Sequence, residues 1–253
     1  ALSSGRYAVA PGTVAAILAS TAVDIPQSWT DTEALVVLMV RFPRTLMAAI
    51  CGVGLAVAGA ALQGLFRNPL VEPQVLGVSS GAGFGGALSL LLGFSGLWLM
   101  AASFIGAWMA LICVLLLARV EGRTSLLMLV LAGFVISAMF SALTSIAVFL
   151  ADPEQQLPGI VFWLMGSFAA VDGMRLAFAA PFIGIGTLLI VALAWRIDVL
   201  SLGDEDARAL GQPVDAIRWT LLCAVALIVA GQVSVSGVIG WVGLVVPYIA
   251  RAL

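Results

Sequence analysis

The residues Gly77-Val-Ser79-Ser-Gly81 match the spacing of a nucleophile elbow, a turn that exposes a reactive serine. Such a serine needs a base to take its proton, and that base is usually histidine. The chain contains neither histidine nor lysine. These absences exclude a Ser-His relay, an HExxH zinc site, a Walker lysine and a Schiff base. The sequence therefore predicts no catalytic residue, and any ATP hydrolysis must belong to a partner chain.

The composition predicts that the chain lies in a lipid bilayer. Of its 253 residues, 62% are hydrophobic and only 9% are charged. Soluble domains are typically about half apolar and about a quarter charged. A helical membrane crossing needs roughly 20 apolar residues, because the backbone must satisfy its own hydrogen bonds in lipid. We therefore expect an all-α, polytopic transmembrane bundle.

Runs of apolar residues predict six crossings separated by polar or Pro-containing loops. The crossings are expected at residues 43–66, 75–93, 96–118, 125–150, 174–195 and 214–233. A shorter apolar stretch at 158–169 is expected to be re-entrant or interfacial. Residues 1–40 read as a polar external lead-in, and residues 1–253 as a single transmembrane domain.

The second predicted crossing carries Gly77, Gly81 and Gly85 at intervals of four residues. Small residues at this spacing let helices approach closely in lipid, where the hydrophobic effect does not drive them together. This interpretation explains the glycines better than a nucleophile elbow. Ser79 and Ser80 lie in the same segment and could line an aqueous path, since hydroxyl groups at membrane depth usually face protein or water.

The most polar stretch of the chain lies between the fifth and sixth predicted crossings. Gly203 precedes three acidic residues, and Gly211 follows as a stop signal, so the pattern predicts a short surface helix. It is either an ordinary solvated loop or a docking element for a cytosolic partner. Cys51, Cys113 and Cys223 lie in separate apolar runs and read as buried hydrophobic residues, with no metal site expected.

Arginine placement suggests an orientation. Placing the loops at 66–74, 119–124 and 196–218 inside gives them six arginines and leaves four outside. Among the outer four, Arg41 and Arg44 flank Pro43 at the start of the first crossing. They are either snorkelling anchors or a docking point for an acidic partner. An external amino terminus would fit a chain that lacks one earlier crossing.

Several ordered motifs resemble the FecCD-type, BtuC-like permeases, the membrane subunits of ABC importers for iron-siderophores, haem and cobalamin. The resemblance begins near residue 30 and runs to the end of the chain. Its motifs are Arg41-Phe-Pro-Arg-Thr, Ala58-Gly-Ala-Ala-Leu-Gln-Gly-Leu-Phe-Arg-Asn-Pro-Leu70, Glu72-Pro73, Leu76-Gly-Val-Ser-Ser-Gly-Ala-Gly83, Trp163-Leu-Met-Gly-Ser167, Leu202-Gly-Asp and Gly240-Trp-Val-Gly-Leu-Val-Val-Pro-Tyr-Ile-Ala-Arg251. Tyr248 departs from the family, which commonly has histidine at that position.

The resemblance implies a ten-helix subunit of a bacterial or archaeal inner membrane, of which this chain, truncated at both ends, covers roughly helices two to eight. It implies a homodimer or a heterodimer with a paralogous permease, two ABC ATPase subunits and a periplasmic or lipoprotein binding protein. ATP and Mg would be used by the ATPase, with no cofactor bound directly. Membrane lipid surrounds the subunit, and the net charge of −2 gives no sign of nucleic acid.

The resemblance also assigns roles to individual residues. Residues 197–213 match the cytosolic coupling segment, and Arg41 and Arg44 match outer arginines that meet the binding protein. The coupling residues are Leu202, Gly203, Asp204, Glu205, Arg208, Leu210 and Gly211. The residues expected to gate or line the translocation path are Asn68, Pro69, Leu70, Ser79, Ser80, Thr124 and Ser125.

An iron-siderophore is the solute that the resemblance favours, with haem, cobalamin and molybdate as alternatives. A different class of protein, an ion-coupled secondary transporter, would need a carboxylate or histidine in mid-span to bind the coupling ion. All 13 acidic residues fall in predicted loops or at the ends of predicted crossings. The sequence therefore favours ATP-driven import.

Overall fold

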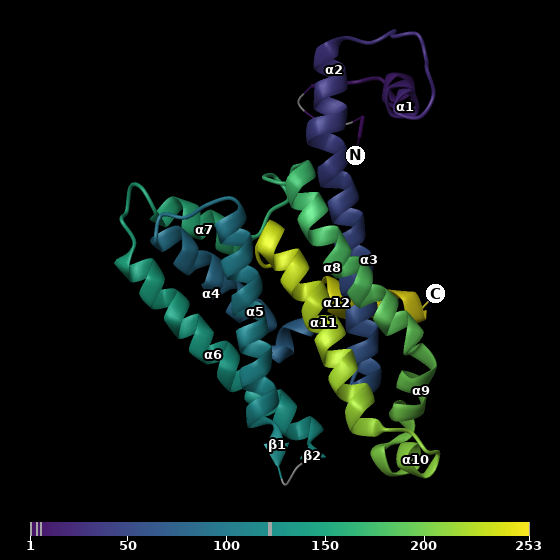
Figure 1. The fold of residues 1–253 in the computed structure, drawn as a ribbon, viewed down its shortest axis with the longest axis vertical. Coiled ribbons are helices and arrows are strands. Elements are labelled where there is room, and N and C mark those ends of the chain that lie inside the picture. The colour runs from purple at the N-terminus through teal and green to yellow at the C-terminus, as the bar shows by residue number, and fades with distance from the viewer. Residues whose placement is uncertain (1, 4, 6, 121–122, 253) are drawn as a thin grey trace.

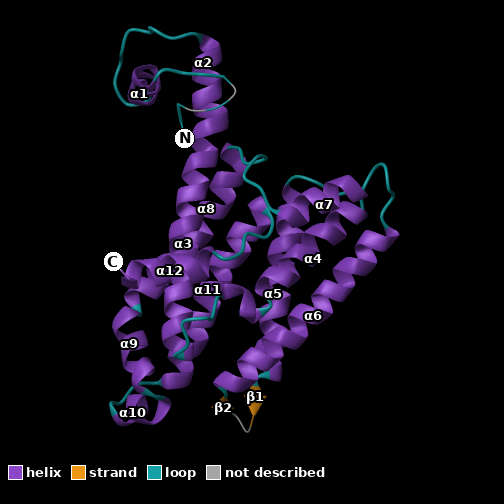
Figure 2. Ribbon diagram, turned by 180° about the vertical axis from the view of Figure 1, so that it is seen from behind, coloured by secondary structure: helices purple, strands orange, loops and turns teal. Residues whose placement is uncertain are grey.

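The computed structural model is an elongated bundle of helices with one small hairpin (Figures 1 and 2). It describes residues 2–3, 5, 7–120 and 123–252. The α-helices of the first half are α1 (Pro11–Ser20), α2 (Asp31–Leu35), α3 (Phe42–Phe66), α4 (Val78–Leu91), α5 (Leu97–Leu117) and α6 (Leu126–Leu150). Those of the second half are α7 (Leu157–Met165), α8 (Gly173–Ala192), α9 (Ala194–Leu202), α10 (Asp204–Ala209), α11 (Val214–Ser236) and α12 (Val242–Ala252). Strands β1 (Arg119–Val120) and β2 (Arg123–Thr124) pair antiparallel.

Within the described part of the chain, five helices are long and apolar enough to cross a membrane. They are the continuous helix Asp31–Phe66 and helices α5, α6, α8 and α11. The prediction of six full-length crossings is wrong for 75–93, because α4 has only 14 residues. At 1.5 Å per residue it spans about 21 Å, less than the roughly 30 Å hydrocarbon core.

Helix α4 is short because the chain turns back into the bundle before it. After α3 ends, the 3₁₀-helix η2 (Pro73–Leu76) lies inside the protein, with Pro73 and Leu76 buried. Gly77 then adopts a left-handed conformation (φ 73°), which permits the sharp change of direction into α4. Apolar residues that were read as one crossing are therefore divided between this re-entrant turn and α4.

The first long helix begins earlier than the sequence predicts. Thr30 and Glu33 form a capping box, in which the Thr30 hydroxyl accepts from the Glu33 N–H and the Glu33 carboxylate accepts from the Thr30 N–H. From Asp31 the helix runs through a π-helical segment, η1 (Val36–Arg41), into α3. The expected end of the lead-in at residue 40 thus lies within a 36-residue helix. Helix α1 packs against its outer part (Figure 1).

Helix α11 forms the centre of the bundle. Of its most apolar window, 78% is buried, against 22–50% for the other four span-length helices. It packs against α3, α4, α5 and α8. Its last turn is polar, and there the Gln232 side-chain amide donates to the Gly237 carbonyl oxygen at 2.8 Å. This hydrogen bond fixes the direction of the loop that follows α11.

Helices α4 and α5 approach so closely that glycine is required between them. A Cβ atom on Gly81 would lie 2.4 Å from the Gly106 carbonyl oxygen, and one on Gly85 would lie 2.2 Å from the Ala102 carbonyl oxygen. Ordinary van der Waals contact begins beyond 3.4 Å. The predicted close packing of this glycine stripe is therefore confirmed.

Three loops are predicted to lie inside, at 66–74, 119–124 and 196–218. Their described parts all lie in the lower half of the bundle in Figure 1. The β1–β2 hairpin and α10 lie at one end, whereas α1, α2 and α7 lie at the opposite end. Helix α7 covers the upper end of α4 and is too short to cross a membrane, as expected for the 158–169 stretch. We call the end with α10 the inner end and the other the outer end.

We predict that Gly81→Ala lowers the free energy of unfolding by about 1–3 kcal/mol, because the new methyl group must displace the α5 backbone. Gly52→Ala is the matched control, since nothing lies within 4 Å of its added Cβ. Thermal unfolding of the detergent-solubilised protein measures both. Equal melting temperatures for the two variants would contradict this account of the α4–α5 contact.

Candidate functional site

The predicted site residues occupy three places in the structure. Ser79 and Ser80 line a cavity within the bundle. The coupling residues and Ser125 lie at the inner end, and Arg41 and Arg44 belong to the outer half of the first long helix. The residues predicted to line the path, to couple to the ATPase and to dock the binding protein therefore lie in different parts of the structure.

The cavity has a volume of about 250 Å³, and four of its eight lining residues carry a hydroxyl group. Its lining residues come from η2, α4, α6, α7 and the loop after α11: Gln74, Ser79, Ser80, Gly83, Ser141, Thr144, Leu164 and Val238. None of them is charged. Sequence reasoning found the two α4 serines but missed Gln74, Ser141 and Thr144. The signal for the α6 pair was their spacing of three residues in an apolar helix, which puts both hydroxyl groups on one face.

The coupling residues form the short surface helix that the sequence predicts. Gly203 ends α9 and precedes α10 with φ 134°, a conformation that side chains other than glycine rarely adopt. Ala207 is fully buried and anchors the helix, whereas Leu202 and Leu210 are each 61% exposed. Two large apolar side chains thus face outward on either side of a fixed helix.

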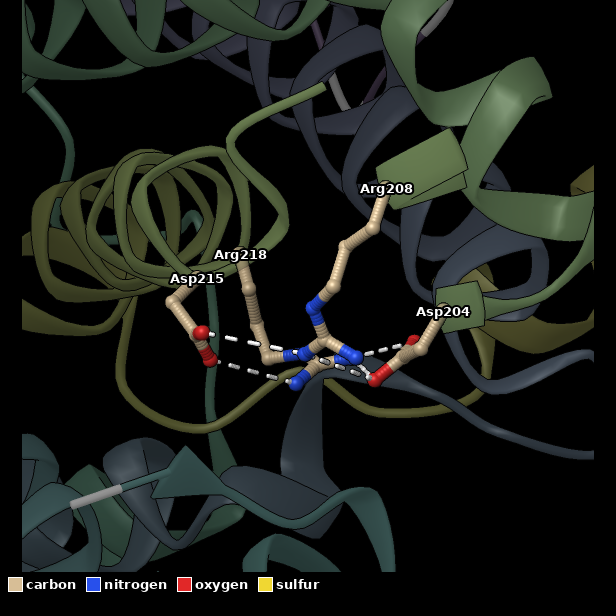
Figure 3. A network of polar contacts seen from close by, with 4 residues as sticks. All are labelled: Asp204, Arg208, Asp215 and Arg218. Atoms are coloured by element: carbon tan, nitrogen blue, oxygen red, sulfur yellow. Dashed lines mark hydrogen bonds and ion pairs between the residues drawn. The ribbon is translucent and has the colours of Figure 1, made fainter. Parts of the chain in front are cut away.

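A network of four charged residues holds α10 against the bundle (Figure 3). The Arg218 guanidinium donates to both carboxylate oxygens of Asp204, at 2.8 and 2.9 Å. Arg208 lies 3.8 Å from Asp204 and from Asp215, and Arg218 lies 3.8 Å from Asp215. The Arg218 side chain is 1% exposed, whereas those of Arg208 and Asp215 are 40% and 45% exposed. Sequence reasoning included Asp204 and Arg208 but missed Arg218 and Asp215.

The predicted gate residues lie on two separate segments. Helix α3 ends at Phe66 and is capped by Arg67 in a left-handed conformation (φ 51°). The Asn68 carboxamide oxygen then accepts from the Leu70 N–H at 3.0 Å. This turn leaves the Leu70 side chain 76% exposed and Pro69 exposed. Ser125 is the N-cap residue of α6, and the Thr124 side chain is outside the described part of the structure. Among the described side chains, no hydrogen bond or ion pair joins the two segments.

Arg41 and Arg44 have different surroundings. The Arg41 guanidinium donates to the carbonyl oxygen of Leu2 at 2.8 Å and to that of Tyr7. Arg44 is half-buried, and its Nε has no partner among the described residues. Arg41 therefore holds the amino-terminal segment, a local role that the sequence did not suggest, and Arg44 is the less engaged of the two cations.

The cysteines and acidic residues of the described chain form no metal-binding cluster. Cys51 is buried, Cys113 and Cys223 are partly buried, and all three are free thiols. Their surroundings agree with the prediction that they pack as small hydrophobic residues.

These features define the class of the protein. Apolar helices of membrane-spanning length form the bundle, a cavity without charged groups lies among η2, α4, α6 and α7, and a charged surface helix lies at the inner end. This is an α-helical membrane transport subunit. The family model of the FecCD transport family matches residues 1–253, and the chain belongs to that family.

Individual members of the family and one solved structure are similar to this chain over most of its length. The chain is 41% identical to the molybdate import system permease protein MolB of Haemophilus influenzae, over all of the chain and 74% of that protein. It is 40% identical to a Helicobacter pylori protein named as a probable iron chelatin transport system permease protein, over 86% of the chain and 65% of that protein. A solved metal-chelate type ABC transporter in an inward-facing conformation has a TM-score of 0.84 at 38% identity, covering 96% of this chain and 80% of its own.

The comparisons confirm several predictions made from the sequence. The chain is an all-helical membrane protein of the FecCD, BtuC-like type, it is a transport subunit and not an enzyme, and it belongs in the cell membrane. The expectation of an iron-siderophore as solute is not confirmed, because the relative aligned over the whole chain is named for molybdate.

The cavity predicts a difference in thiol accessibility. With Cys51, Cys113 and Cys223 replaced by alanine, we expect Ser80→Cys to react readily with a water-soluble maleimide, because Ser80 lines the cavity. Ser103→Cys should stay unreactive, since Ser103 is fully buried in α5. Mass spectrometry of the labelled protein in nanodiscs gives the two rates, and equal rates would mean that the cavity is closed to water.

Proposed function

We propose that the chain is the membrane-spanning permease subunit of an ABC importer, which moves a small metal-containing solute toward the cytosol while a separate ATPase hydrolyses ATP. The observation that carries the proposal is α10, a fixed surface helix at the inner end with exposed apolar residues on both sides. A transporter driven by an ion gradient has no need of such an element.

Helix α10 has the properties of a docking element for an ATPase. Ala207 and the Asp204–Arg218 ion pair hold it in place, so a partner that binds it loses little conformational entropy. Leu202 and Leu210 would enter an apolar cleft of the partner, and Glu205 and Arg208 would lie at the polar rim. Force applied to α10 would then reach the bundle directly.

Family membership and the solved metal-chelate type transporter support a proposal for the remaining partners. We propose two permease subunits, either identical or paralogous, two ATPase subunits that bind ATP and Mg, and an external substrate-binding protein. In this arrangement the inner end faces the cytosol. The turn Asn68–Leu70 and the start of α6 at Ser125 would narrow the inner mouth of the path.

Two observations favour molybdate over an iron-siderophore as the solute. The molybdate permease aligns with the whole chain at 41% identity, whereas the iron chelatin relative aligns with 86% of it. The cavity also carries four hydroxyl groups, from Ser79, Ser80, Ser141 and Thr144, and no charged group. The serine and threonine hydroxyl groups of this cavity can donate hydrogen bonds to the oxygens of a tetrahedral oxyanion.

The experiment uses the full-length permease assembled in nanodiscs with the ATPase encoded beside it. Binding proteins loaded with molybdate, a ferric siderophore, haem or cobalamin are added in turn, and ATP hydrolysis and uptake into proteoliposomes are measured. Stimulation by the molybdate-loaded protein is expected. Stimulation by a binding protein loaded with another solute would identify that solute in place of molybdate. If no complex with the ATPase forms, the proposal of an ABC importer is refuted.

We predict that Leu210→Glu weakens binding of the ATPase about tenfold, or ~1.4 kcal/mol, because it places a charge in an apolar contact. Met174→Glu is the control, since Met174 is similarly exposed but belongs to the outer end of α8. Pull-down titrations of the detergent-solubilised subunits measure both affinities. If the two variants bind equally well, α10 is not the docking element.

At the outer end, reversal of charge at Arg44 should slow association with the binding protein and make it less sensitive to salt. Arg41→Glu should have the additional effect of releasing the amino-terminal segment, because it removes the donors to Leu2 and Tyr7. Surface plasmon resonance on nanodiscs measures association, with ATPase binding as the internal control. Unchanged association rates for Arg44→Glu would remove this residue from the docking surface.

A further inference from the structure

Arg218 and Trp219 are adjacent residues near the start of α11, and each contacts a different element of the inner end. Arg218 forms two hydrogen bonds with Asp204, the first residue of α10. Trp219 lies under the Arg119 guanidinium, whose Cζ is 5.0 Å from the ring centroid. Arg119 lies two residues after the end of α5 and belongs to β1. Two consecutive residues therefore connect α10 and the end of α5 to one helix.

The Arg218–Asp204 pair is the strongest contact in this group. It is bidentate and charge-assisted, and the arginine is almost fully removed from water. The contacts of Arg208 lie at 3.8 Å between side chains that are 31–45% exposed, so solvent screens them. Breaking the Arg218 pair would leave a buried charge without its main partner, which strongly resists separation of α10 from α11.

Helix α11 can carry a displacement from this point to the cavity. It is unbroken from Val214 to Ser236, a length of about 35 Å at 1.5 Å per residue. At its far end the Gln232 amide holds the Gly237 carbonyl oxygen, and the next residue, Val238, lines the hydroxyl cavity. The buried arginine and the cavity wall are thus opposite ends of one packed helix.

We infer that Arg218 and Trp219 form a coupling junction, which transmits movement of α10 through α11 to Val238 at the cavity and through Arg119 to α5. Both are positioning residues, since neither lines the cavity. The inference rests on the proposed function, because it assigns the route by which ATPase-driven movement of α10 reaches the solute path. A route of this kind needs evidence of energetic coupling beyond spatial contact.

The first test measures solute transported per ATP hydrolysed by the assembled complex in proteoliposomes. Asp204→Asn is expected to lower this ratio about tenfold while the complex still assembles, a size typical of coupling between sites. Asp206→Asn is the matched control, because Asp206 lies in the same turn of α10, is exposed and forms no ion pair among the described residues. It should keep the wild-type ratio.

A double-mutant cycle separates coupling from simple stability. If Asp204 and Arg218 act as a pair, Asp204→Asn with Arg218→Gln should couple no worse than either single variant. Should these variants fail to assemble, Trp219→Leu keeps an apolar side chain but removes the ring under Arg119, and it should also lower the ratio. Wild-type ratios in every variant that assembles would overturn the inference.

The second test does not depend on the ATPase. A nitroxide attached at Ala209→Cys, in the background without native cysteines, reports the mobility of α10. Asp204→Asn should increase that mobility, and Asp206→Asn should not. Unchanged mobility in Asp204→Asn overturns the junction even if the wild-type complex imports solute. A wild-type complex without ATP-driven uptake refutes the proposed function instead, so the two failures are distinguishable.

Discussion

Helices in a bilayer gain almost nothing from the hydrophobic effect when they associate, since lipid is as apolar as their side chains. The bundle is held instead by close approach of backbones and by polar contacts protected from water. The α4–α5 contact depends on Gly81 and Gly85, where a Cβ would overlap carbonyl oxygens of α5. Because α4 is fixed in this way, the cavity that its serines line has a defined wall.

The same constraint explains where the charged groups lie. A charge at the centre of a bilayer is costly unless it is paired, and the ion pairs found among the described residues lie at the inner end. There, the Asp204–Arg218 pair joins a six-residue helix to the most buried helix of the bundle. A helix as short as α10 would not be stable alone, and its rigidity comes from this pair and from buried Ala207.

The cavity and the inner end have complementary properties for transport. The cavity presents hydroxyl groups without charge, which suits the reversible binding of a solute that we propose. The inner end presents a rigid helix with exposed leucines, suited to a strong contact with a driving partner. In the function that we propose, these two regions act together, and α11 is the element that connects them.

Composition and local spacing alone determined that this is an all-α membrane protein without histidine or lysine, with a close-packing glycine stripe and a surface helix near Asp204. These properties depend on residue types within one or two helical turns, which is why the sequence reveals them. Tertiary structure decided that the chain re-enters before α4, that Arg41 binds backbone oxygens more than 30 residues away, and that Arg218 pairs with Asp204. It also brought Ser141 and Thr144 to the α4 serines. Such contacts depend on which faces of distant helices meet, and no local pattern in an apolar sequence specifies that.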